Sequence, residues 1–305
     1  MVWLRLSMVA AITLVPTALL GQGQLGMQQV ADGVYVYTES DGGEDPPTVS
    51  SLVVISDDGV LIGDGLGHVR DVHESDVKAQ KLIDEVKKLT DQPIKYLINC
   101  SGHPDHTNGN HLFRDAGALI LGHREAREGL LVYYEGNAEI PQAPPTVTYE
   151  DSLTFFLGDK EVRILFLGRA HTEGDSVTYL SGEGVAFLSE IFFNKQFPGL
   201  RAGYPTEWVE TLNRILELDE DIFIPGHGLV EDGGRLRQTV VDMRDDLVDM
   251  RAEVKGHFDR GLSRDEIMAL YPLKKYGSLI NAYRNLPIAV DRILMELRGE
   301  LDPSN

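Results

Sequence analysis

The sequence predicts an α/β fold with a helical C-terminal extension, and three observations support this prediction. Between residues 29 and 224, short runs rich in Val, Ile and Tyr alternate with amphipathic segments of helical length. Beyond residue 230 the strand-like runs stop, and apolar residues recur at spacings of three and four. Hydrophobic residues make up 42% of the 305 residues, which is ample for a sizeable packed core.

The N-terminal segment has the form of a secretory signal. Arg5 precedes an almost uninterrupted apolar or small stretch at 6–20, and Gly21 and Gly23 offer a cleavage point. We therefore expect a signal peptide at 1–23 and an exported protein, periplasmic or secreted. The alternative is a retained anchor, the one case in which we expect contact with a membrane.

The first half of the chain is expected to supply most of one sheet. Val- and Ile-rich runs bounded by Gly and Asp predict strands at 29–38, 51–57, 59–65, 94–98 and 118–121. Apolar residues spaced among charged ones predict helices at 74–90, 108–113 and 124–134. The Pro-rich segment 136–148 has no periodicity and is expected to be a loop.

The second half repeats this alternation and then becomes helical. Strands are predicted at 152–156, 161–166, 176–181, 184–188 and 221–224, and a helix at 207–218. A long helix is predicted from one apolar stripe: Val240, Met243, Leu247, Met250 and Val254. Ser263 and Glu266 form a capping box for a short helix, and a last helix at 288–297 ends before Gly299.

The segment after the predicted strand 94–98 is the first to indicate chemistry. His103, Asp105 and His106 place two imidazoles and a carboxylate within four positions, where a buried strand releases the chain into a loop. Such a set preorganises a divalent metal. The sequence therefore predicts a metal site at this loop.

Three later segments extend the pattern. Residues 168–175 read Gly-Arg-Ala-His-Thr-Glu-Gly-Asp, 187–193 read Phe-Leu-Ser-Glu-Ile-Phe-Phe, and 224–228 read Ile-Pro-Gly-His-Gly. In this order, and over about residues 27–230, the four motifs resemble those of the metallo-β-lactamase superfamily. The resemblance implies a four-layer αβ/βα sandwich over residues 24–232. The helical pattern beyond it predicts an appended helical subdomain at 233–300, followed by a disordered tail at 301–305.

The resemblance also implies a set of ligands. One metal site would take Asp105, His106 and His227, and the other would take His103 and His171. Two positions depart from the family pattern: Ser101 stands where the first His is expected, and Glu190 stands where a metal-bridging Asp is expected. Glu190 is still expected to be a metal ligand, either reaching both ions or binding one.

Residues near these ligands are assigned supporting roles. Ser101 is a weak ligand or a hydrogen-bond donor, and Asp64 and Asp175 are weak ligands or supports behind the ligands. Cys100 is the only cysteine, so no intrachain disulfide can form. Because side chains alternate along a strand, we expect its thiol to point away from Ser101 and to be packed and inert.

The implied cofactor is zinc, with one ion tightly bound and a second ion weaker or absent because a serine hydroxyl is a poor ligand. The implied reaction is hydrolysis of a small ester, lactone, thioester or amide, with Asp105 orienting the attacking water and passing its proton to the leaving group. The loop 136–148 and the C-terminal helices are expected to influence substrate choice.

Two alternatives use the same residues. One is an iron-dependent oxygenase of persulfides, and the other is an exported accessory protein with a partly lost metal site. The formal net charge of −20 argues against binding to nucleic acid, whose phosphates require Lys and Arg. We also expect that the C-terminal helices could join two copies of the chain.

Overall fold

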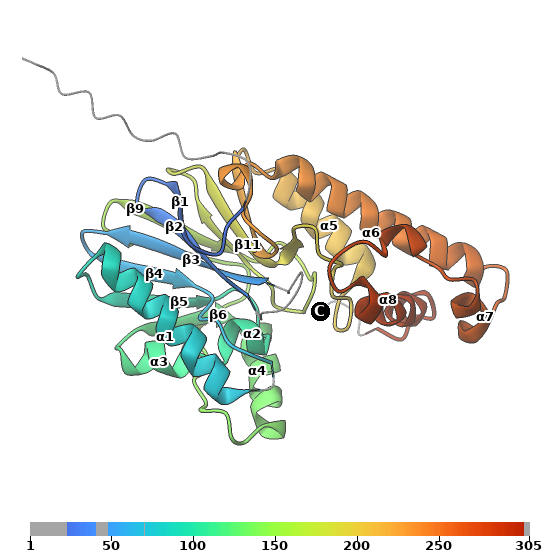
Figure 1. The fold of residues 1–305 in the computed structure, drawn as a ribbon, viewed down its shortest axis with the longest axis horizontal. Helices are drawn as coiled ribbons and strands as arrows, with labels where there is room; N and C mark the ends of the chain where they lie inside the picture. The colour runs from blue at the N-terminus through green and yellow to red at the C-terminus, as the bar shows by residue number, and fades with distance from the viewer. Residues whose placement is uncertain (1–22, 41–47, 70, 302–305) are drawn as a thin grey trace, which may run out of the picture.

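The computed structural model describes residues 23–40, 48–69 and 71–301. The expected signal peptide lies outside these residues apart from Gly23, and the expected tail lies outside them apart from Leu301. Two sheets stack between two layers of helices, as the four-layer sandwich requires, and the C-terminal helices extend one side (Figure 1). Among the described residues, no helix combines the length and apolarity needed to cross a bilayer.

The first sheet has seven strands in chain order. They are β1 (Gly26–Ala31), β2 (Val34–Ser40), β3 (Thr48–Ser56), β4 (Gly59–Gly63), β5 (Ile94–Asn99), β6 (Leu119–His123) and β7 (Val147–Tyr149). Strands β1 to β4 pair antiparallel, whereas β4 to β7 run parallel. The parallel strands bring their carboxyl ends to one edge of the sheet, where the metal loop begins.

The second sheet has five strands in the order β12-β11-β10-β9-β8. They are β8 (Ser152–Leu157), β9 (Lys160–Leu165), β10 (Val177–Leu180), β11 (Val185–Phe193) and β12 (Ile222–His227). The pair β11 and β12 is parallel, so both strands deliver their last residues to the same edge.

Three layers of apolar side chains hold the sandwich together. Leu61 and Ile98 of the first sheet share a buried cluster with Phe187 and Ile224 of the second sheet. Helix α1 (Val72–Leu89) buries one face, including Leu82, on the outside of the first sheet. The shorter helices on this side are α2 (Pro104–Thr107), α3 (Asn110–Asp115) and α4 (Arg124–Gly136).

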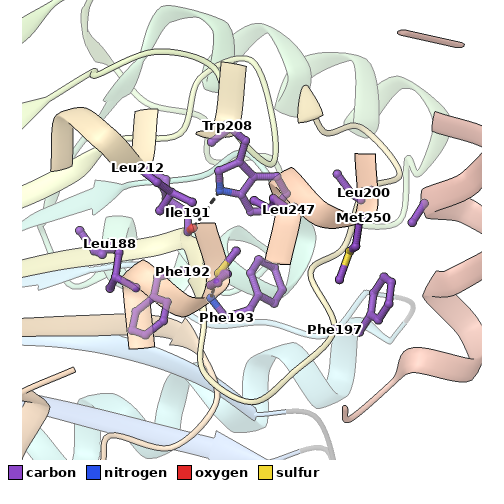
Figure 2. Packing of buried hydrophobic residues seen from close by; sticks show 14 of the residues in the cluster. Leu188, Ile191, Phe192, Phe193, Phe197, Leu200, Trp208, Leu212, Leu247 and Met250 are labelled. Atoms are coloured by element: carbon purple, nitrogen blue, oxygen red, sulfur yellow. Dashed lines mark hydrogen bonds between the residues drawn. The ribbon is translucent and has the colours of Figure 1, made fainter. Parts of the chain in front are cut away.

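The outer face of the second sheet is covered by α5 (Pro205–Leu216), α6 (Arg237–Phe258) and α8 (Ala282–Leu297). Figure 2 shows Trp208 of α5 packed among Ile191, Leu212 and Leu247, with its indole N–H aimed at the Ile191 carbonyl. The five residues of the predicted stripe on α6 are all buried in this cluster. The C-terminal helices therefore share a core with the second sheet.

Four details differ from the expectations. The predicted strand 29–38 is two strands, because the chain turns at Asp32 and Gly33, where Gly33 has φ +66°. The expected loop 136–148 contributes to β7, and helix α8 begins at Ala282 with Pro287 inside it. The strand expected at 184–188 continues to Phe193 as β11.

The remaining elements are short. Helix α7 (Arg264–Ala269) begins with the predicted capping box, since Ser263 accepts from the Glu266 N–H and Glu266 accepts from the Ser263 N–H. The 3₁₀ turns η1 (Asp232–Gly234) and η2 (Lys274–Tyr276) complete the described elements.

Candidate metal centre

The predicted site residues meet at the strand ends of both sheets. Asp64 follows β4, Ser101 follows β5, His103 precedes α2, Asp105 and His106 lie in α2, His171 lies between β9 and β10, Glu190 is in β11, and His227 ends β12. Segments up to 163 positions apart in the chain therefore converge on one small volume, as Asp64 and His227 do.

Among the described residues, the side chains that can hold a metal form two groups that share one carboxylate. The first group is Asp105, His106, Glu190 and His227, and the second is His103, His171 and Glu190. Within each group the donor atoms lie within 4.8 Å of one another. Glu190 thus stands between the two groups.

The first group has the spacing of ligands around a single ion. The Nε2 atom of His227 lies 3.3 Å from Nε2 of His106, 3.3 Å from Oε1 of Glu190 and 3.6 Å from Oδ2 of Asp105. Tetrahedral ligands about 2.0–2.1 Å from zinc are separated by roughly 3.3 Å. Four protein donors are available here, so this group can enclose an ion.

The second group has three protein donors and faces solvent. His103 Nδ1 lies 2.9 Å from His171 Nε2 and 2.8 Å from Glu190 Oε2, and His171 Nε2 lies 3.2 Å from Glu190 Oε1. The His103 side chain is 31% exposed, whereas the Glu190 side chain is 2% exposed. Three donors with an open side are the arrangement of a catalytic zinc site, in which water takes the remaining position.

The hydrogen bonds behind the imidazoles of His106 and His227 orient both rings toward the space between them. His106 Nδ1 donates to Asp64 Oδ2 at 2.8 Å, and His227 Nδ1 donates to the Thr48 carbonyl at 2.9 Å. With Nδ1 of each ring engaged in this way, the two Nε2 atoms face each other across 3.3 Å. A metal ion between them would replace the proton that the raised pKa of His106 places there.

Glu190 reaches its central position through an irregularity in β11. The pairing of β11 with β12 shifts register at Ser189, which has φ +47°. Gly226 of β12 allows this bulge, since a Cβ there would lie 2.3 Å from the Ser189 carbonyl carbon. Glu190 is thereby aimed at the ligands, and Ser101 Oγ donates to its Oε2 at 2.5 Å.

The charges of the site reinforce one another. Burial lowers the pKa of His106, but the nearby carboxylates of Asp64, Glu190 and Asp105 raise it by more, so that the pKa is about 10. Burial also lowers the pKa of His103, but the Glu190 carboxylate contributes most to raising it, to about 9. Burial raises the pKa of Glu190, but His103, His171 and His106 hold it well below its ordinary value.

Asp64 supports the site from behind. Its φ of +65° turns the chain after β4, and its carboxylate accepts from the Cys100 N–H at 2.8 Å, from Ser189 Oγ at 2.5 Å and from His106. Asp64 belongs to neither donor group, and its contact with His106 Nδ1 suits a residue that orients a ligand.

Cys100 points away from the donors, as predicted. Its buried Sγ lies 3.2 Å from Thr178 Oγ1 in the interior. Burial raises the pKa of the thiol well above its ordinary value, which makes the group inert.

Asp175 also lies outside both donor groups. Its carboxylate accepts from the backbone N–H of Thr172 and from Thr172 Oγ1, both at 2.5 Å, and so holds the turn after His171. The other histidines within the described ranges, His68, His73, His111, His123 and His257, are in neither group.

Two residues of the centre were not identified from the sequence. Thr48 contributes through its backbone carbonyl, which carries no side-chain signal. Ser189 links Asp64 to the strand that bears Glu190, and its place directly before Glu190 was the only available signal.

Comparisons with known proteins bear on the family and on the fold of the chain. The sequence profile of the Metallo-beta-lactamase superfamily matches residues 44–227. The chain is 23% identical over 245 residues to a linear primary-alkylsulfatase from a Pseudomonas species, covering 65% of this chain and 46% of the relative. It is 24% identical over 138 residues to the 2,4-dinitroanisole O-demethylase subunit alpha of a Nocardioides species, covering 45% of this chain and 41% of the relative.

The chain therefore spans less than half the length of these curated relatives. Solved structures share its fold at low identity. A metallo-β-lactamase from Pontibacter korlensis superposes with a TM-score of 0.58 at 18% identity, covering 70% of this chain and 97% of that chain. The metallo-β-lactamase IND-7 gives a TM-score of 0.58 at 17% identity, with 72% and 97% covered.

Proposed function

The chain belongs to the metallo-beta-lactamase superfamily, and from this premise we propose that it is a metal-dependent hydrolase of a small organic substrate. The observation that carries the proposal is the pair of donor groups that share Glu190, with the second group open beside His103. We propose zinc as the metal, because imidazole and carboxylate donors suit it.

When bound, divalent ions would lower the pKa of a water ligand toward about 7 and draw electron density from the substrate carbonyl. The protein residues supply the geometry. Glu190 spaces the two donor groups, and Asp64 and Thr48 fix the tautomers of His106 and His227. Asp105, whose side chain is 20% exposed, is placed to orient the water and to carry its proton to the leaving group.

We propose a small ester, lactone, thioester or amide as the substrate. The names of the two curated relatives add a primary alkyl sulfate and an aryl methyl ether to the substrates worth assaying. In each of these six substrate classes, water can attack an atom that is bonded to a leaving group.

The test is hydrolysis of this panel by the purified chain saturated with zinc. Asp105→Asn should lower kcat by roughly 100-fold or more, the usual contribution of a positioned acid–base group. The matched control is His73→Ala, which removes an exposed imidazole outside both donor groups and should leave kcat unchanged. If the metal-loaded chain cleaves no member of the panel, the proposal fails.

The same preparation tests the alternative activities. Bound iron with oxygen consumption in the presence of a persulfide would favour the oxygenase, and the lack of any tightly bound metal would favour the accessory protein. Export and pairing through the C-terminal helices remain predictions from the sequence.

A further inference from the structure

A cavity of about 510 Å³ opens beside the second donor group. His103 is the donor residue that lines it, and it is also the most exposed of the donor imidazoles. The expected loop 136–148 contributes no lining residue; the walls come from α4, from the turn after His171, from residues 201–204 and from α8. The route to the metal centre thus runs between α4 and the C-terminal helix.

One wall is fixed firmly against the metal loops. A Cβ on Gly102 would lie 2.7 Å from the Ala126 carbonyl oxygen, and a Cβ on Gly174 would lie 2.3 Å from the Ala126 nitrogen. Both glycines let α4 approach the segments that carry His103 and His171. Ala126 and Tyr133 of α4 line the cavity on this side.

The opposite wall is tied to the ligand-bearing part of the chain through Arg292 of α8. Its Nε donates to the Gly203 carbonyl at 2.5 Å and its Nη2 donates to the Ala202 carbonyl at 2.8 Å. The guanidinium also lies 5.1 Å from the Tyr204 ring centre. Tyr204 in turn donates its N–H to Ala170, the residue before His171, at 2.9 Å.

Charged side chains also line the cavity, and two of the acids among them have partners. Glu173 accepts from the Tyr204 hydroxyl, and Glu300 pairs with Arg298 at 2.8 Å. Met295 and Leu301 are half-buried and present apolar surface opposite α4. An unbranched methionine adapts to ligands of varied shape, and pockets for organic ligands are mostly apolar with few polar groups.

We propose that α8 completes the substrate pocket and favours substrates that carry an apolar group on the bond to be hydrolysed, with that group lying between α4 and Met295. This inference rests on the proposed hydrolase function, since the ligand is a substrate only if the chain hydrolyses it. Binding of the ligand can be measured without turnover. The C-terminal helix is then a specificity element of the metal centre.

The test is calorimetric titration of the purified chain with butanoate, hexanoate, octanoate and decanoate. The carboxylate head is common to the series, so its contribution cancels between members. Affinity should rise roughly two- to fourfold for each added methylene that becomes buried. Met295→Trp fills the cavity and should weaken octanoate binding at least tenfold while leaving butanoate within twofold.

Leu270→Trp is the matched control, because it places the same ring on an exposed residue of the helical region outside the cavity. It should leave the whole series unchanged. Met295→Ala provides a second variant if the tryptophan prevents folding. It should reduce the increase in affinity per added methylene for the longer chains.

Affinity that does not depend on chain length, or equal effects of Met295→Trp and Leu270→Trp, would overturn the inference. Hydrolysis is scored separately. Chain-length-dependent binding without cleavage of any ester would leave this inference standing and remove the proposed function, whereas cleavage without chain-length dependence would do the reverse.

Discussion

Glu190 lies where the donor imidazoles of both groups converge, and its position depends on Ser101. The two residues are 89 positions apart, yet Ser101 Oγ donates to Glu190 Oε2 at 2.5 Å in a fully buried contact. The longer acid and the smaller residue therefore share the space between the two donor groups. The sequence shows Ser101 and Glu190 as two separate departures from the family pattern, whereas the structure places them in direct contact.

Removing this carboxylate should dismantle the second metal site. Glu190→Ala leaves His103 and His171 as its only donors. Metal affinity there should fall by more than roughly 100-fold, because even residues that only orient a ligand contribute about 10- to 100-fold. Competitive chelator titration measures the change, with His73→Ala as the control. Unchanged affinity at both sites would show that Glu190 is not a ligand.

The contact between Ser101 and Glu190 predicts that substitutions at these two positions have non-additive effects on metal content. Ser101→His alone should lower metal content, because the larger ring would meet the Glu190 carboxylate in a buried site. Ser101→His combined with Glu190→Asp shortens the acid and should restore two metals per chain. Elemental analysis of the parent, both single variants and the double variant gives the coupling, and strictly additive effects would contradict a shared space.

The burial of Cys100 predicts that its thiol does not react in the folded chain. The thiol is buried, and its raised pKa keeps it protonated at pH 8. Iodoacetamide should therefore leave the folded chain unmodified and alkylate it after unfolding in guanidinium chloride, as intact mass would report. Equal labelling rates in both states would mean that the strand end is open to solvent.

At the level of elements, the sequence predicted the helices that carry a periodic apolar stripe or a capping motif. The stripe on α6 and the capping box at Ser263 are both present in the structure. Helix α2 has only four residues, too few for a periodic signal, and β7 exists because it pairs with β6. The bulge at Ser189 depends on its contact with β12, a partner that lies more than 30 residues away in the chain.

Trp208 of α5 connects the helical layer to the metal centre. It is fully buried, donates to the Ile191 carbonyl at 2.9 Å, and its ring centre lies 5.5 Å from that of His171. Trp208→Ala should lower the free energy of unfolding by about 3–5 kcal/mol. Trp208→Phe keeps most of the bulk and should cost about 1 kcal/mol for the lost hydrogen bond.

Denaturant unfolding of the two variants measures both values. A loss below about 1 kcal/mol for Trp208→Ala would contradict the close packing of α5 on the second sheet.

On the scale of the whole molecule, the metal centre joins the two sheets. His103 and His106 follow a strand of the first sheet, whereas Glu190 and His227 lie in the second. Sequence motifs could name these residues through their resemblance to a family, but their contacts cross up to 121 positions, as between His106 and His227. Only the folded sandwich shows that one carboxylate serves both groups.

Metal should therefore stabilise the entire fold. Zinc at 100 times its Kd should add about 2.7 kcal/mol to the free energy of unfolding for each site, because the unfolded chain does not assemble these ligands. Thermal unfolding with and without a chelator measures the effect, which should be smaller in His227→Ala. An unchanged Tm after metal removal would contradict a preformed centre.

The most direct test of a metal centre shared through Glu190 is the number of metal ions that one chain binds. Zinc titrated into chelator-treated protein and followed by calorimetry should show two ions per chain, the second bound more weakly because its group has three donors instead of four. A value of one or none would contradict a centre in which Glu190 serves two donor groups.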